Sequence, residues 1–266
     1  GEGRTAAGHQ RMQNDVLSLQ AHEILPMLTA LEPEDPLGRQ AVAILSGWSG
    51  EHGPDSAGAA LYNAWLVEAV ELLARGPLGE DLYARWGGTH GGFLSAVFGG
   101  PAWSLCLQPA ERRRPATTSC SELAGLALDR AIQRLQKDLG PDPKAWRWGD
   151  LHTVAWKHPL AFTPHLKAAL NTSGESGGGA WTLNMGAYRY GQPFDHIWSA
   201  SYRQVIDLGD WDRSLWVHSP GQSGVPWRAH YRDLAEPWRA GELLPMPFSR
   251  AAIEAAAVRQ RVLAAP

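Results

Sequence analysis

The stretch SYRQVIDLGDWDRSLWVHSPGQSGVPWRAHYRD, Ser201 to Asp233, carries the strongest structural pattern in this chain. Its first part, residues 202–208, is rich in β-forming side chains and ends at Gly209-Asp210, a pair typical of turns. A second run of β-formers, residues 215–218, follows at once. The stretch therefore predicts a tight hairpin, which a Gly-Gln-Ser-Gly loop and the start of a helix follow.

Outward from the hairpin, the first two-thirds of the chain has the periodicity of helices, and strands become credible only after about residue 180. Helices are expected at residues 12–31 (with Pro26 as a kink), 41–45, 56–75, 118–139, 231–240 and 249–263. Strands are expected at residues 181–184, 202–208 and 215–218, and a flexible surface loop at 174–179. The fold class is α+β. Three strands leave open sheet edges, so we expect this chain to complete a sheet begun by another polypeptide.

Composition excludes several functional classes. The chain has 266 residues, 44% of them hydrophobic, a net charge of −3 and a pI near 6.4. These values give no footprint for nucleic acid. The run Arg112-Arg113-Arg114 is interpreted as a solvated loop. No apolar run approaches the roughly 18 residues of a membrane span. Gly1 is expected to mark a processing or cloning boundary.

Two cysteines, Cys106 and Cys120, lie 14 positions apart. In an exported protein they could form a disulfide, which would stabilise the chain by roughly 3 kcal/mol. In a reducing compartment they would be two thiols. A metal site on them is disfavoured because no Cys-x-x-Cys or His-x-x-x-His spacing accompanies them.

Six blocks in order resemble the penicillin acylase (penicillin amidase) family of N-terminal-nucleophile hydrolases. They are RMQNDVLSLQAHEILPML (from Arg11), LSGWSGEHGPDSAGAALYNAW (from Leu45), WRWGDLHTVAWKHPL (from Trp146), WTLN (from Trp181), SYRQVIDLG (from Ser201) and GQSGVPWRAHYRDLAEPW leading to PMPFSR. Their order places residues 1–266 in the second half of the large (β) subunit, with a helical portion at about 10–160 and a sheet-completing portion with terminal helices at about 180–266.

The resemblance implies part of a four-layer α-β-β-α sandwich and an amidohydrolase (acylase) that cleaves linear amides. The family's nucleophile is an N-terminal Ser with its own α-amino group as base. Residue 1 here is Gly, so the nucleophile is expected on another chain, and Ser18, Ser201 and Ser223 are not candidates. The implied partners are the remaining β-subunit segment and an α-subunit. The implied substrate is a small N-acyl amide, either a β-lactam side-chain amide or an N-acyl homoserine lactone. The resemblance also implies export to the periplasm or medium, which favours the disulfide. No cofactor is expected, and no metal ligands are assigned.

One supporting catalytic group can be carried over. In some members of the family, the strand that corresponds to SYRQVIDLG supplies a carboxylate that orients the catalytic histidine, and the matching position is Asp207. Such a carboxylate fixes the tautomer of an imidazole and favours its charged form. The alternative is a structural Asp that pairs with Arg203 or caps the turn at Gly209.

Other polar and aromatic residues have weaker claims to a site. Trp146, Trp148, His152 and Trp156 could line an acyl pocket, but packing between layers is the favoured role. His218 is interpreted as structural, and Asn184 as a residue that holds a loop. Two rival hypotheses remain for the chain as a whole: a non-catalytic structural or binding module that keeps the acylase framework, and an independent helical domain.

Overall fold

The computed structural model describes residues 5–86, 92–107, 116–259 and 262. They form two compact units that interleave along the sequence. Unit 1 comprises Gly1–Asn14, His158–Thr172 and Ala200–Pro266, and unit 2 comprises Asp15–Lys157 and Ser173–Ser199. The run Arg112-Arg113-Arg114 and Gly1 lie outside the described residues. In the part of the chain that is described, no helix is both long and apolar enough to cross a bilayer.

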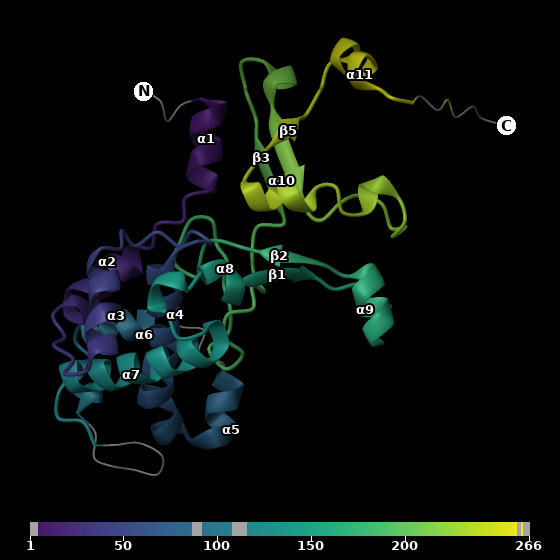
Figure 1. Cartoon of the computed structure of the whole chain (residues 1–266). Coiled ribbons are helices and arrows are strands. Elements are labelled where there is room, and N and C mark those ends of the chain that lie inside the picture. The colour runs from purple at the N-terminus through teal and green to yellow at the C-terminus, as the bar shows by residue number, and fades with distance from the viewer. Residues whose placement is uncertain (1–4, 87–91, 108–115, 260–261, 263–266) are drawn as a thin grey trace. The chain divides into compact units, whose positions relative to one another are not determined.

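Unit 2 is mainly helical, and its helices cluster around α4 (Figure 1). Its elements are α2 (Leu19–Thr29), α3 (Pro36–Ser46), α4 (Ala57–Val70), the π-helix η2 (Glu71–Arg75), α5 (Gly76–Trp86), α6 (Gly92–Phe98), the 3₁₀-helices η3 (Trp103–Cys106) and η4 (Pro143–Ala145), α7 (Cys120–Leu139), α8 (Trp148–Leu151) and the paired strands β1 (Thr153–Trp156) and β2 (Thr172–Glu175).

Helix α4 forms the centre of unit 2. Every residue from Gly58 to Val70 is buried. Most of them are apolar, and the two polar ones are bonded, Asn63 to the Tyr188 hydroxyl and Glu68 to Arg134. Helix α7 packs against it with one stripe, which includes Leu123, Ala127, Ala131 and Leu135. Ser119 caps α7, since its hydroxyl accepts a hydrogen bond from the Glu122 amide at 3.1 Å, and Gly140 ends it with a positive φ of 100°.

A ladder of histidine and aromatic rings lies next to α4 in unit 2. His52 meets the ring of Trp148 edge-on, and Trp148 stacks on His152 with 4.4 Å between ring centroids. His152 stacks in turn on His196, with 4.9 Å between centroids and 5° between planes. Nδ1 of His152 donates to the Phe194 carbonyl at 2.6 Å, and Nδ1 of His52 donates to the Gly50 carbonyl at 3.1 Å. His52 and His152 are thus buried core rings, and burial lowers the pKa of both.

Unit 1 contains the predicted hairpin. Strands β3 (Tyr202–Val205) and β4 (Leu215–His218) pair antiparallel, with Tyr202 opposite His218 and Val205 opposite Leu215. A short third strand, β5 (Leu244–Pro245), pairs with the other side of β4. The helices of the unit are α1 (Ala6–Gln13), α9 (Pro164–Leu170), α10 (Ala235–Ala240) and α11 (Arg250–Ala256), with 3₁₀ turns η5 (Trp211–Arg213) and η6 (Ala229–Tyr231).

Several boundaries differ from the sequence predictions. The helix expected at residues 12–31 is split into α1 and α2, because Ser18 caps a new helix; Pro26 lies inside α2. The helix expected at 56–75 does not stop at Gly76-Pro77, since a π turn carries the chain into α5. The C-terminal helices are shorter than expected, and β1 and β2 add strands before residue 180.

Two predictions between residues 174 and 184 are wrong. Residues 181–184 form turns instead of a strand, because Thr182 Oγ1 bonds back to the Asn184 carbonyl at 2.8 Å and accepts from the Gly179 amide at 3.0 Å. Residues 174–179 are not a surface loop, since residues 174 and 175 belong to β2. Gly178 and Gly179 are buried, and a Cβ on Gly179 would lie 3.1 Å from the ring of His52, so these glycines allow a close approach of backbone to core.

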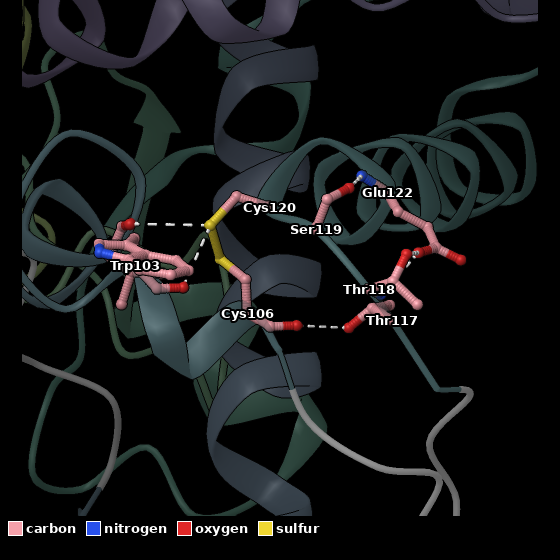
Figure 2. Close-up of a disulfide and its surroundings, with 8 residues drawn as sticks. Trp103, Cys106, Thr117, Thr118, Ser119, Cys120 and Glu122 are labelled. Atoms are coloured by element: carbon pink, nitrogen blue, oxygen red, sulfur yellow. Dashed lines mark hydrogen bonds between the residues drawn. A yellow bond between two sulfur atoms is a disulfide. The ribbon is translucent and has the colours of Figure 1, made fainter.

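The two cysteines form a disulfide, Cys106–Cys120, which joins η3 to the first residue of α7 (Figure 2). Thr117 Oγ1 donates to the Cys106 carbonyl at 2.6 Å, so both ends of the bridged segment are held together. Cys106 is fully buried. The open question between a disulfide and two thiols is thus settled in favour of the disulfide.

Removal of this disulfide should destabilise the protein. In the chain-entropy model, a loop of this length contributes about 3 kcal/mol by restricting the unfolded chain. We expect the double variant Cys106→Ser/Cys120→Ser to melt at a lower temperature than the parent, measured by circular dichroism. The parent in reductant should move in the same direction, and reductant should leave the double variant unchanged. Equal melting temperatures for parent and double variant would contradict this role.

The histidine ladder predicts a loss of stability in acid. Burial lowers the pKa of His52 to about 4 and that of His152 to about 3, whereas an unfolded histidine titrates near 6.5. The unfolded chain therefore takes up protons as the pH falls below about 6.5, and the native chain does not. Stability is complete above pH 6.5 and declines towards pH 4, by up to about 1.4 kcal/mol per pH unit for each histidine.

Melting temperatures between pH 8 and pH 5 would measure this slope. His152→Asn, whose amide can keep the bond to the Phe194 carbonyl, should melt lower overall but with a shallower dependence on pH. His52→Asn tests the second ring in the same way. The exposed His165 provides the matched control, His165→Asn. A parallel pH dependence for all three variants and the parent would show that the ladder does not cause the acid sensitivity.

Candidate functional site

Asp207 lies just beyond the end of β3, in the turn that leads to β4. Its Oδ1 accepts from the amides of Gly209 at 3.0 Å and Asp210 at 3.2 Å. Its Oδ2 accepts from two nitrogens of Arg213, Nε at 3.0 Å and a terminal nitrogen at 2.6 Å. Arg213 and these amides hold the pKa of the Asp207 carboxyl below its usual value. The group is therefore an anion that closes the hairpin turn.

This geometry bears on the predicted role of Asp207. A carboxylate has about four acceptor positions, and four N–H groups of its own turn already point at this one. A cap on the turn at Gly209 was one of the alternatives considered from the sequence, and Asp207 does accept a hydrogen bond from the Gly209 amide. The arginine partner is Arg213, while Arg203 donates to the Trp238 carbonyl at 2.8 Å and lies over its ring. Orientation of a catalytic histidine by Asp207 stays a prediction.

Asp207 borders a hollow of about 560 Å³ in unit 1. Two segments far apart in the sequence line it: Thr5, Ala6, Ala7 and His9 from the start of α1, and residues 205–208 with Arg213 from the hairpin. His9 is held by its own helix, since its Nδ1 bonds to the Thr5 carbonyl at 2.9 Å. The sequence analysis missed this contribution of α1, because no pattern in the chain links residues 5–9 to a turn about 200 positions later.

Three of the four residues considered for an acyl pocket are buried in the core. Trp146 and Trp148 are buried, and their indole N–H groups donate to the carbonyls of Gly140 and Gly178, each at 2.9 Å. His152 is also fully buried. Trp156 is half-buried in β1. The packing role that the sequence favoured for these rings is confirmed for Trp146, Trp148 and His152.

The sequence analysis did not identify Ser176 and His196, which form a contact between a hydroxyl and an imidazole. Ser176 Oγ lies 2.8 Å from His196 Nδ1, a distance at which a histidine could activate a nucleophile. Both side chains are buried. The ring of His152, which stacks on His196, leaves no room for a substrate. A methyl group on Gly186 would lie 2.6 Å from Nε2 of His152 and 3.2 Å from Cε1 of His196. The pair therefore belongs to the core.

The remaining sequence candidates lie apart from any constellation. Asn184 is in a turn, where its backbone amide donates to the Asp15 carbonyl at 2.8 Å. That its side chain holds a loop stays a prediction. His218 is half-buried in β4. Among the described residues, no three His, Cys, Asp or Glu side chains gather in a way that could hold a metal ion.

Comparison with known proteins gives one consistent result. A model of the penicillin amidase family matches residues 1–255. An acyl-homoserine lactone acylase (QuiP) of Pseudomonas putida is 29% identical over 96% of this chain and 34% of its own length. The penicillin acylase 2 proenzyme of Pseudomonas sp. is 29% identical over 82% of this chain and 28% of its own length. This chain thus spans about a third of the relatives that it matches.

A solved structure shows the same fold. The thermostable penicillin G acylase of Alcaligenes faecalis superposes on 95% of this chain and 48% of its own, with a TM-score of 0.54 at 17% sequence identity. The fold is therefore α+β and forms part of the N-terminal-nucleophile hydrolase sandwich, as the six sequence blocks predicted. Because the family model matches residues 1–255 of this chain, the chain belongs to the penicillin amidase family.

Proposed function

We propose that this chain is the C-terminal part of the β-subunit of an N-acyl amide hydrolase whose N-terminal Ser lies on another chain. The observation that carries the proposal is the match of the family model to residues 1–255, together with acylase relatives of which this chain spans about a third. In such an enzyme the Ser hydroxyl attacks the amide carbonyl, and its proton passes to the α-amino group. The C–N bond then breaks, the protonated amine leaves, and water hydrolyses the acyl-ester.

Strand β3 supports a role in a larger sheet. It lies at one end of the three-stranded order β3-β4-β5. Because the Ser219 amide bonds to the Ser201 carbonyl, the alternation of an antiparallel pair turns the backbone groups of Tyr202 and Gln204 away from β4. Gln13 Nε2 reaches the Gln204 carbonyl at 2.9 Å. An edge of this kind is suited to pairing with a further strand, and we propose that the rest of the β-subunit and an α-subunit supply it.

The proposed substrates are N-acyl homoserine lactones, with β-lactam side-chain amides as the second candidate. Six of the relatives are acyl-homoserine lactone acylases and one is a penicillin acylase proenzyme. We also propose that the enzyme is exported to the periplasm or the medium. The Cys106–Cys120 disulfide supports this location, because disulfides persist in oxidising compartments.

The complete enzyme, with all its processed chains, tests the proposal. It should hydrolyse decanoyl-homoserine lactone, measured by release of the free amine, and an N-terminal read should find one chain that begins with Ser. Benzylpenicillin in the same assay distinguishes the second substrate class. A preparation that binds these amides but cleaves none of them would favour the non-catalytic binding module that the sequence left open.

Asp207→Asn tests the proposed positioning role within that enzyme. If the carboxylate orients a histidine, kcat should fall about 100-fold with little change in KM, and the kcat–pH profile should shift because the imidazole loses its anionic partner. Arg213→Gln is the matched control, since it breaks the same ion pair and keeps the carboxylate. If both variants lower the melting temperature alike and leave kcat unchanged, Asp207 serves only the turn.

A further inference from the structure

A second hollow lies in unit 2, where α5, α6 and η3 come together. Its volume is about 670 Å³, and its lining includes Leu78, Leu82, Trp86, Phe93 and Leu105. Of the described residues that line it, only Arg85 carries a charge. Ligand sites in proteins have volumes of about 300–1,000 Å³ and apolar walls with a few polar groups. The size and lining of this hollow fit that description.

The wall of this hollow depends on an irregular backbone. Helix α4 runs into the π turn of η2, and π turns inside helices are frequent at functional sites. Gly79 then adopts a φ of 71° within α5, a conformation that glycine accepts without strain. Arg75 holds the bend between η2 and α5. Its guanidinium binds Glu71 at 3.2 Å and Glu80 at 2.7 Å, and it lies 4.5 Å from the centroid of the Tyr83 ring.

The opposite side of the hollow is tied to the disulfide. Leu105 precedes Cys106, which is bonded to the first residue of α7. The backbone on both sides of the hollow is therefore fixed. The apolar side chains that line it remain exposed to solvent, Leu82 by 54% and Leu105 by 38%. Apolar surface left in water is unfavourable in proportion to its area. An apolar ligand that covered these side chains would recover this free energy.

The charge of Arg85 specifies the other half of the ligand. In contrast to Arg75, the Arg85 guanidinium makes no ion pair within the described part of the chain. It lies near the end of α5, directly before Trp86, and both residues line the hollow, so an anionic group at its rim could reach the guanidinium. Hydrogen bonds between a guanidinium and a carboxylate are charge-assisted and comparatively strong.

We infer that this hollow binds the apolar chain of a fatty carboxylate, with the carboxylate on Arg85. An N-acyl amide hydrolase releases such an acid, so the biological source of the ligand rests on the proposed function, whereas the binding itself follows from the hollow. Every described residue of its lining belongs to unit 2.

Calorimetric titration of the complete enzyme with decanoate tests this inference. Leu82→Asp should abolish one equivalent of decanoate binding, because a carboxylate would then face the apolar chain. Arg85→Gln should weaken that equivalent about tenfold, since a charge-assisted bond is lost. Decyltrimethylammonium, with the same chain and the opposite charge, should not occupy this site in the parent. Leu19→Asp is the matched control, because Leu19 is 71% exposed outside the hollow, and it should bind decanoate like the parent.

Two results would overturn the inference. One is equal decanoate stoichiometry in Leu82→Asp, Leu19→Asp and the parent. The other is resistance of Leu82→Cys to maleimide in the native enzyme but not after unfolding, which would show that polypeptide covers the hollow. Failure of the proposed function gives a different signature, an absence of amide hydrolysis, and does not change the binding titration.

Discussion

The burial of α4 on all sides is the constraint on which unit 2 depends. A helix with no exposed face requires a partner in every direction, and here α3, α6, α7 and α8 supply them. The contact at its first turn is close: a Cβ on Gly58 would lie 2.3 Å from Cγ of Trp48. This approach brings Trp48 against His52 and Tyr62, and so places the ring ladder that supports α8. Gly58, in the first turn of α4, therefore lets Trp48 lie beside His52, the first ring of the ladder.

The sequence predicted those elements whose local pattern agrees with their surroundings. Helix α7 has a clear apolar stripe, a serine cap and a terminal glycine, so its predicted range differs from the observed one by two residues. The hairpin of β3 and β4 was equally visible in its β-formers and turn pair. The segment from 173 to 199 was not predictable in this way. Trp181 and Leu183 have strand propensity, but the glycines before them pack on His52 and the backbone closes on itself through Thr182. Tertiary contacts there override local preference.

The neighbourhood of Asp207 shows a different limit of sequence reasoning. An Asp at the end of a strand indicated a carboxylate with a cationic or turn partner, and in the structure Asp207 pairs with Arg213. Nothing local indicated which arginine pairs with it, because Arg203 is on the strand itself, whereas Arg213 is brought opposite by the turn. The helix that completes the hollow comes from residues 6–13, almost 200 positions earlier. The family blocks indicated Asp207 alone, and the hollow that it borders forms only when both segments have folded.

The charged groups at the two hollows described above differ in their partners. In unit 1, Asp207 and Arg213 satisfy each other, and His9 is bonded to its own helix. In unit 2 the walls are apolar and Arg75 is doubly paired, but Arg85 has no ion pair among the described residues. A cation at the rim of an apolar hollow attracts an amphiphilic anion, because the head and the tail are then both matched. These two hollows thus differ in kind: the charged groups that line the first satisfy each other, whereas the second combines apolar walls with a cation.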